Sequence, residues 1–79
     1  MNTRLRELRE DRDLTQTQCS KIASISKNSY IRYENGDRVP PLDTIKTFAE
    51  YYNVSIDYIA KLTNIKKFIQ EQNKFDNLK

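Results

Sequence analysis

The segment SISKNSYIRYENG at residues 24–36 carries a polar edge whose side chains could bind another molecule. Lys27, Asn28 and Ser29 stand together at the start of a predicted helix, and Arg32 follows one turn further along. These side chains supply an amide, a hydroxyl and positive charge, all able to form hydrogen bonds. A helix that only had to pack against a core would not need such an edge. We therefore interpret it as a surface that binds a polar partner.

The composition lacks the residues of common catalytic sites. The 79 residues include no histidine and only one glycine. The absence of histidine removes Cys₂His₂ zinc sites, Ser-His-Asp triads and imidazole acid–base chemistry, and one glycine cannot form a glycine-rich phosphate loop. We therefore expect no enzyme, no metal and no cofactor. The net charge of +3 and the pI of about 9.1 suit a polyanionic partner.

The cellular compartment of the protein is indicated by its apolar stretches and by its one cysteine. No stretch has the apolar run of a signal peptide or of a membrane span. A single cysteine, Cys19, cannot form an internal disulfide, so we expect a reducing cytoplasm. Cys19 could be a redox switch, but its place in an apolar stripe favours a small core residue.

Short helices joined by tight turns are predicted, since one Gly and two Pro leave little room for hairpins. A first helix runs to about Asp11, and others cover about 16–23, 27–35, 41–52 and 56–60, with a possible sixth in 63–79. The expected N-caps are Thr3 or Asn2, Thr15, Ser26 and Ser55. Left-handed or terminating positions are expected at Asp13, Gly36 and Asn53.

Apolar residues recur at helical spacing in each predicted helix, which indicates one all-α domain with a single core. The expected core residues are Leu5, Leu8, Cys19, Ile22, Ala23, Tyr30, Tyr33, Leu42, Ile45, Phe48, Ala49, Tyr52, Ile56 and Ile59.

The second and third predicted helices meet the requirements of a helix-turn-helix. Ser20 and Ser24 are small where the two backbones must approach, and Ile25, Tyr30 and Tyr33 are apolar where the helices must share a core. In that motif the second helix projects from the surface, N-terminus first.

Three blocks of the chain resemble a known family. "LTQTQ…KIA…IS…SYIRYENG…P" followed by "FAEYYNVSIDYI" is similar to the Xre family, the Cro/C1-type helix-turn-helix domains of phage repressors and their bacterial relatives. The resemblance runs from about Arg4 to Ala60. It implies a five-helix, lambda-repressor-like DNA-binding domain over residues 1–62, followed by a helix or tail over 63–79.

The resemblance also implies roles for the polar edge. Lys27, Asn28, Ser29 and Arg32 occupy positions that read base edges in the major groove. Their chemistry agrees, because Lys or Arg donates to guanine O6 and N7, and Asn can pair both ways with adenine.

Further roles follow from the same resemblance. Gln16, Asn35 and Arg38 match positions that contact the DNA phosphates, which set register and affinity. Glu34 would be repelled by DNA, so it is expected to form a structural ion pair with Arg9. Three residues depart from the family pattern: Ser24 stands in the turn where Gly or Asn is usual, Asp37 replaces a residue that is often basic, and Pro41 replaces a common N-cap Ser.

The implied function is a sequence-specific regulator of transcription, of the repressor type, encoded by a bacterium or phage and located with the nucleoid. It would bind a palindromic operator in double-stranded DNA as a homodimer, with half-sites about 10–10.5 base pairs apart. Ile65, Phe68 and Ile69 in the tail are the dimerisation candidates. A regulatory protein partner could control it.

Other interpretations remain open. The polar edge could be a solvated helix face, Arg38 an ordinary surface charge, and Gln16 an exposed residue without a partner. The apolar stripe of the tail could fold back on its own domain. On the same scaffold, a protein-interaction module such as an antitoxin or adaptor is the alternative function.

Overall fold

The computed structural model describes residues 3–61, and these form five α-helices and no strand. The helices are α1 (Leu5–Asp11), α2 (Gln16–Ile22), α3 (Lys27–Asn35), α4 (Leu42–Tyr52) and α5 (Ile56–Ile59). The all-α class and the five-helix domain are therefore confirmed. The expected sixth helix in 63–79 lies outside the described residues, and so do Ile65, Phe68 and Ile69.

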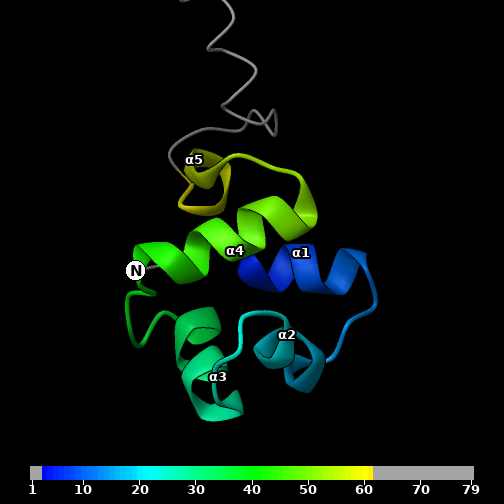
Figure 1. Ribbon diagram of the computed structural model, residues 1–79, viewed down its shortest axis with the longest axis vertical. Coiled ribbons are helices and arrows are strands. Elements are labelled where there is room, and N and C mark those ends of the chain that lie inside the picture. Colours follow the sequence, from blue (N-terminus) through cyan, green and yellow to red (C-terminus); the bar gives the residue numbers. More distant parts are fainter. Residues whose placement is uncertain (1–2, 62–79) are drawn as a thin grey trace, which may run out of the picture.

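The described helices lie at successive levels in the view of Figure 1. The α2–α3 pair occupies one end, α1 and α4 lie across the middle, and α5 lies at the opposite end. The helix-turn-helix is thus presented at a tip of the domain, with the other helices behind it.

Local hydrogen bonds begin three of the helices as predicted. Thr15 Oγ1 accepts a hydrogen bond from the Gln18 N–H, and the Gln18 side chain accepts one from the Thr15 N–H, which together form a capping box. The hydroxyl groups of Ser26 and Ser55 cap α3 and α5 in the same way, each accepting from a backbone N–H three residues on.

Left-handed residues end the helices or shape the turns that follow them. Asp13 (φ 55°), Gly36 (φ 84°) and Asn53 (φ 58°) have positive φ at the places that the sequence indicates. Ser24 in the α2–α3 turn also has positive φ, 57°. A non-glycine residue in this conformation costs roughly 1–2 kcal/mol, so the turn is held by its surroundings.

The expected cap of α1 is wrong by one residue, and the expected range 41–52 begins one residue before α4, although the family resemblance places Pro41 at the N-cap position. The N-cap of α1 is Arg4, without a side-chain cap, although Thr3 Oγ1 accepts a hydrogen bond from the Leu5 N–H at 3.3 Å. Pro41 is the N-cap of α4 with ψ 155°, and the first helical residue is Leu42. Proline still fits, because its missing N–H would have no partner at a helix start.

Leu42 was expected in the core, and this is wrong, because 65% of it is exposed. Helical side chains lean toward the N-terminus of their helix. At the first position of α4, Leu42 therefore extends past the end of the helix instead of onto its neighbours. The buried stripe of α4 begins later, at Thr44 and Ile45.

The remaining core joins all five helices. The buried apolar residues are Leu5, Leu8, Cys19, Tyr30, Tyr33, Ile45, Phe48, Ala49, Tyr52, Val54 and Ile59, with Ile22, Ala23 and Ile56 packed against them in part. Cys19 is fully buried, with its Sγ 3.4 Å from the Tyr52 hydroxyl, as a core residue should be. An edge-to-face contact between Tyr30 and Phe48, with ring centroids 5.8 Å apart, ties α3 to α4.

Candidate nucleic-acid interface

The turn between α2 and α3 brings the two helices into close contact. Ser20 is buried, and its carbonyl oxygen accepts a hydrogen bond from the Ile25 N–H at 2.9 Å. The Ser20 hydroxyl donates to the Thr17 carbonyl at 2.7 Å, so even the polar atom of this small side chain is used inside the helix. A larger residue at position 20 would separate α2 from the turn, which would change the direction of α3.

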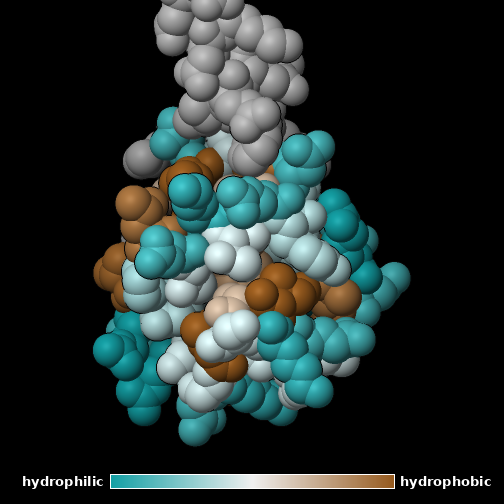
Figure 2. All heavy atoms as spheres, viewed as in Figure 1, coloured by the Kyte–Doolittle hydropathy of each residue, from teal (hydrophilic) through white to brown (hydrophobic). Residues whose placement is uncertain are grey.

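The side chains of α3 divide into two faces. Tyr30 and Tyr33 are buried and fix the helix to the core. Lys27, Asn28 and Arg32 are exposed, and none of them forms a side-chain hydrogen bond or ion pair with the described part of the chain. Figure 2 shows mostly hydrophilic residues at the outer tip formed by α2 and α3. This exposed face is free to contact another molecule.

Ser29 differs from its neighbours in the polar edge. It is half-buried, and its hydroxyl oxygen accepts a hydrogen bond from the Ser26 hydroxyl at 3.0 Å. Its own O–H proton can still be donated outward, because a hydroxyl accepts and donates at once. Of the four predicted base-reading residues, it is the one already used in the local structure of α3.

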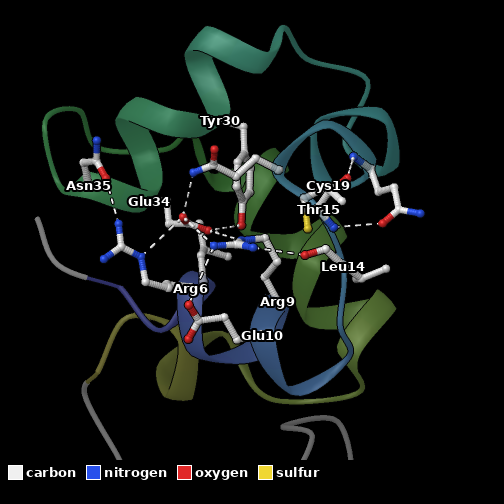
Figure 3. A network of polar contacts seen from close by, with 12 residues as sticks. Arg6, Arg9, Glu10, Leu14, Thr15, Cys19, Tyr30, Glu34 and Asn35 are labelled. Carbon is white, nitrogen blue, oxygen red and sulfur yellow. Dashed lines mark hydrogen bonds and ion pairs between the residues drawn. The ribbon is translucent and has the colours of Figure 1, made fainter.

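The carboxylate of Glu34, near the end of α3, is the centre of a polar network (Figure 3). Its side chain is fully buried, and Arg9 on α1 donates to it from Nε at 2.8 Å and from Nη2 at 3.2 Å. The Tyr30 hydroxyl donates to it at 2.8 Å and Gln16 Nε2 at 2.9 Å. Arg6 Nε completes the set at 3.4 Å. One carboxylate thus joins α1, α2 and α3.

The electrostatics of this network keep Glu34 ionised. Burial by itself raises the pKa of the Glu34 carboxyl, but hydrogen bonds from Arg9, Tyr30 and Gln16 more than offset burial, and the net pKa lies below its ordinary value. The hydrogen bond to Glu34 raises the pKa of Arg9 in turn. Burial and the hydrogen bond to Glu34 raise the pKa of Tyr30, so its hydroxyl remains a donor.

Arg9 also holds the connection between α1 and α2. Its Nη1 donates to the Leu14 carbonyl oxygen at 3.0 Å, in the loop that leads into the capping box of α2. The ion pair between Arg9 and Glu34 that the family resemblance implies is therefore present. It positions the start of α2 as well as the end of α3.

The three residues expected to contact phosphate have different surroundings. Gln16 is half-buried, and one N–H of its amide is used by Glu34 while the second stays available. Asn35 is exposed, and its Oδ1 accepts a hydrogen bond from Arg6 Nη2 at 3.0 Å. Arg38 is exposed in the loop after α3, where its backbone N–H donates to the Arg32 carbonyl at 3.3 Å.

Arg6 is part of this site, and the sequence analysis missed it. Its side chain is 54% exposed and contacts both Glu34 and Asn35. The signal available in the sequence was its spacing of three residues from Arg9, which places the two side chains on one face of a helix. That spacing alone does not say what the face meets.

A groove of about 500 Å³ lies where the three N-terminal helices meet. Its lining includes Arg6, Arg9, Gln16, Thr17 and Lys27 beside Glu34. Glu10, an exposed carboxylate, also lines the groove, so its charged lining consists of three cations, Arg6, Arg9 and Lys27, and two carboxylates, Glu10 and Glu34. No group of residues that could hold a metal ion occurs in the described part of the chain, and no described helix is long and apolar enough to cross a membrane.

Comparison with known proteins gives the family. The Helix-turn-helix family model HTH_3 matches residues 5–59. The chain is 38% identical over 78 residues to YobD of Bacillus subtilis, an uncharacterized HTH-type transcriptional regulator, with 86% of this chain and 70% of YobD covered. It is 36% identical over 55 residues to RstR, the cryptic phage CTXphi transcriptional repressor of Vibrio cholerae, covering 70% of this chain and 50% of RstR.

A third relative is named as an antitoxin and not as a transcriptional regulator. The antitoxin PezA of Streptococcus pneumoniae is 39% identical over 58 residues, which cover 72% of this chain and 37% of PezA. The matched regions thus span 37% to 70% of the length of these three relatives. No solved structure matches. None of the three is named as an enzyme, in agreement with the missing catalytic residues.

The matched segment contains α1 to α5 and every contact of the Glu34 network described above. The chain therefore belongs to the HTH_3 helix-turn-helix family, the Xre or Cro/C1 type of DNA-binding transcriptional regulators.

Proposed function

We propose that this protein is a repressor that reads a specific sequence in double-stranded DNA with α3 in the major groove. The observation that carries the proposal is the free polar face of α3. Lys27, Asn28 and Arg32 are exposed without partners in the described residues, while the opposite face is fixed by buried Tyr30 and Tyr33. Recognition of base edges requires side chains with hydrogen-bond donors on a helix whose position is fixed.

Phosphate contacts would come from the residues beside α3. Gln16 at the start of α2 has one amide N–H left to donate, and Asn35 at the end of α3 has its Nδ2 group left. Arg38, one short loop further, is an exposed cation. Such contacts orient the protein on the duplex without reading its sequence. Ser29 would contribute to base reading through its remaining O–H.

Binding as a two-fold dimer fits this mode of recognition, with half-sites about 10–10.5 base pairs apart on a palindromic operator. The dimer contact would use α4, α5 or the segment that follows them, because α1 to α3 are occupied by the core, the Glu34 network and DNA. Ile65, Phe68 and Ile69 are the candidates in that segment. The 36% identity to a phage repressor supports repression, while a relative of 26% identity is named as a transcriptional activator.

Removing the residues after Thr63 tests the dimer. We expect the shortened protein to be more monomeric, because the three apolar candidates would be gone. Sedimentation at several protein concentrations measures this, and the substitution of the polar Gln72 by Ala in the full chain serves as a control that should not change the association. A shortened protein that still dimerises as strongly as the full chain would clear the tail of this role.

The function itself is tested by selecting binding sites from random double-stranded DNA with the full chain at physiological salt. The expected winner is a palindrome with half-sites one helical turn apart. Affinity for the selected site should fall steeply with salt, with a slope of about −0.9 in log K against log salt for each phosphate contact. Lack of enrichment would argue against sequence-specific binding by this chain alone.

A second function is favoured by one observation, the 39% identity to an antitoxin. In that case the chain would bind a partner protein. The similar region covers 37% of PezA, so what the two chains share is the helix-turn-helix domain. Co-purification with the product of the neighbouring gene, and loss of DNA selection without it, would favour this second function.

A further inference from the structure

We infer that Arg6 is a positioning residue for DNA binding: it holds the Asn35 side-chain amide with its NH₂ group turned outward, toward the phosphate. The phosphate contact in this inference rests on the proposed function, and the orientation of Asn35 rests on its hydrogen bond with Arg6. Family resemblance assigned no role to Arg6.

The guanidinium of Arg6 donates to two acceptors at once, Glu34 and Asn35. Its Nη2 donates to Asn35 Oδ1 at 3.0 Å, and its Nε lies 3.4 Å from Glu34 Oε1. Guanidinium is planar and rigid, so two simultaneous contacts from one fork determine its orientation. Glu34 is a firm anchor for that fork, because its buried carboxylate is also held by Arg9 and Tyr30.

The orientation of Asn35 follows from what Arg6 can offer. Arg6 has only donors, so the part of the Asn35 amide that it contacts must be the carbonyl oxygen. The amide nitrogen then points to the other side, as Figure 3 shows, where it is not held by Arg6. A phosphate oxygen accepts hydrogen bonds only, so it needs the nitrogen. With the amide turned around, the Asn35 oxygen would face the phosphate and repel it.

Without Arg6, the exposed Asn35 side chain would rotate among several rotamers and both amide orientations. Binding would then have to order it, which we expect to weaken affinity about two- to tenfold. The loss should be alike for every DNA sequence, since a phosphate contact carries no sequence information. A direct contact of Arg6 with phosphate makes a different prediction, because removal of that cation would also reduce the salt slope by about 0.9.

The first experiment needs no DNA. NMR relaxation of the Asn35 side-chain NH₂ group is measured in the full chain and in Arg6→Ala. We expect Arg6→Ala to lower the order of this group on the nanosecond timescale. Arg12→Ala is the matched control, since it removes the same charge from the far end of α1, where Arg12 contacts the Tyr52 carbonyl. Equal order of Asn35 in Arg6→Ala and in the full chain would overturn the inference.

The second experiment measures affinity for the selected DNA site over a range of salt concentrations in Arg6→Ala, Asn35→Ala and the double variant. If Arg6 acts through Asn35, the double variant binds as Asn35→Ala does, and Arg6→Ala keeps the salt slope of the full chain. A loss from Arg6→Ala that persists without Asn35, with a reduced slope, would show a direct phosphate contact and overturn the positioning role.

Arg6→Lys separates charge from geometry, because lysine keeps the charge but lacks the planar fork. We expect Asn35 to be as mobile in Arg6→Lys as in Arg6→Ala. Affinity and Asn35 order both equal to those of the full chain would mean that charge alone suffices, against the inference. Thermal unfolding of each variant establishes that it is folded. If the full chain selects no DNA at all, the proposed function fails and the phosphate part of the inference with it, while the relaxation result still decides whether Arg6 orders Asn35.

Discussion

Two polar parts of α3 lie close together in sequence but have opposite surroundings. One part is exposed and free of partners among the described residues, and the other is buried and fully hydrogen-bonded. Lys27, Asn28 and Arg32 are exposed and have no side-chain partner in the described residues. Glu34, two residues beyond Arg32, is fully buried and accepts hydrogen bonds from four other side chains. Both parts are polar. What distinguishes them is whether the polar groups are satisfied within the domain.

The difference shows how one short helix can be both held and available. The Glu34 network and the buried tyrosines fix the position of α3 against α1 and α2, which the exposed donors need if they are to meet base edges accurately. The exposed donors in turn cost the domain nothing, since water satisfies them in the absence of DNA. Changes to the two parts should therefore separate stability from recognition.

The largest expected effect is from Glu34→Ala. It removes the buried carboxylate that pairs with the guanidinium of Arg9, whose side chain is 16% exposed, and loss of one partner of a buried ion pair costs about 3–5 kcal/mol. Urea denaturation measures the free energy of unfolding. Glu10→Ala is the matched control, because that carboxylate is 61% exposed and 3.9 Å from Arg9, and its removal should cost about 0–1 kcal/mol. Equal costs for the two variants would contradict the central role of Glu34.

The same network predicts how stability depends on pH. The folded-state pKa of Glu34 is below its ordinary value of 4.5, so its contribution is complete above that value and is lost as the pH falls through the folded-state pKa. Unfolding free energies measured from pH 7 down to pH 2 should decline more steeply below pH 4.5 in the full chain than in Glu34→Gln. Parallel profiles would mean that Glu34 has the same pKa folded and unfolded.

Arg32→Ala tests the free face. We expect a loss of about 1–3 kcal/mol of discrimination at one base position, because each good contact to a base edge contributes about that much. Binding-site selection with the variant should show relaxed preference at that position, and the free energy of unfolding should stay within about 0.5 kcal/mol of the full chain, as for other exposed residues. Unchanged preference at every position would remove Arg32 from the base-reading set.

Gln16→Ala lies between the two parts, since Gln16 contacts Glu34 and still has one N–H for a phosphate. We expect weaker binding to all DNA sites alike, by about 0.5–1.5 kcal/mol, the usual net contribution of one hydrogen bond. The preferred sequence should not change. Lys21→Ala on the exposed side of α2 is a comparison for general surface effects. A changed preferred sequence would place Gln16 among the base-reading residues instead.

Much of the fold could be predicted from the sequence because it depends on short-range patterns. The caps at Thr15, Ser26 and Ser55 each involve a residue three positions on, and Gly36 ends α3 because it has no Cβ to resist positive φ. The wrong prediction that Leu42 lies in the core also has a local physical reason. Its spacing matches the apolar stripe of α4, but periodicity does not say how far a core extends toward the end of a helix.

Three of the four side chains that contact Glu34 lie 18 to 28 positions away in the chain, while Tyr30 lies one helical turn away on α3. Arg6 reaches 29 positions to Asn35. Family resemblance identified the Arg9 pair, and the i, i+4 spacing of Tyr30 and Glu34 places those two side chains on one face of α3. No local rule could say that Arg6 and Gln16 meet the same carboxylate. The sequence by itself determined helices, turns and the motif, through capping, backbone sterics and apolar spacing. Only the tertiary structure decided which polar side chains are satisfied inside and which remain free, because packing α1 against α2 and α3 sets the distances between their donors and the one buried acceptor.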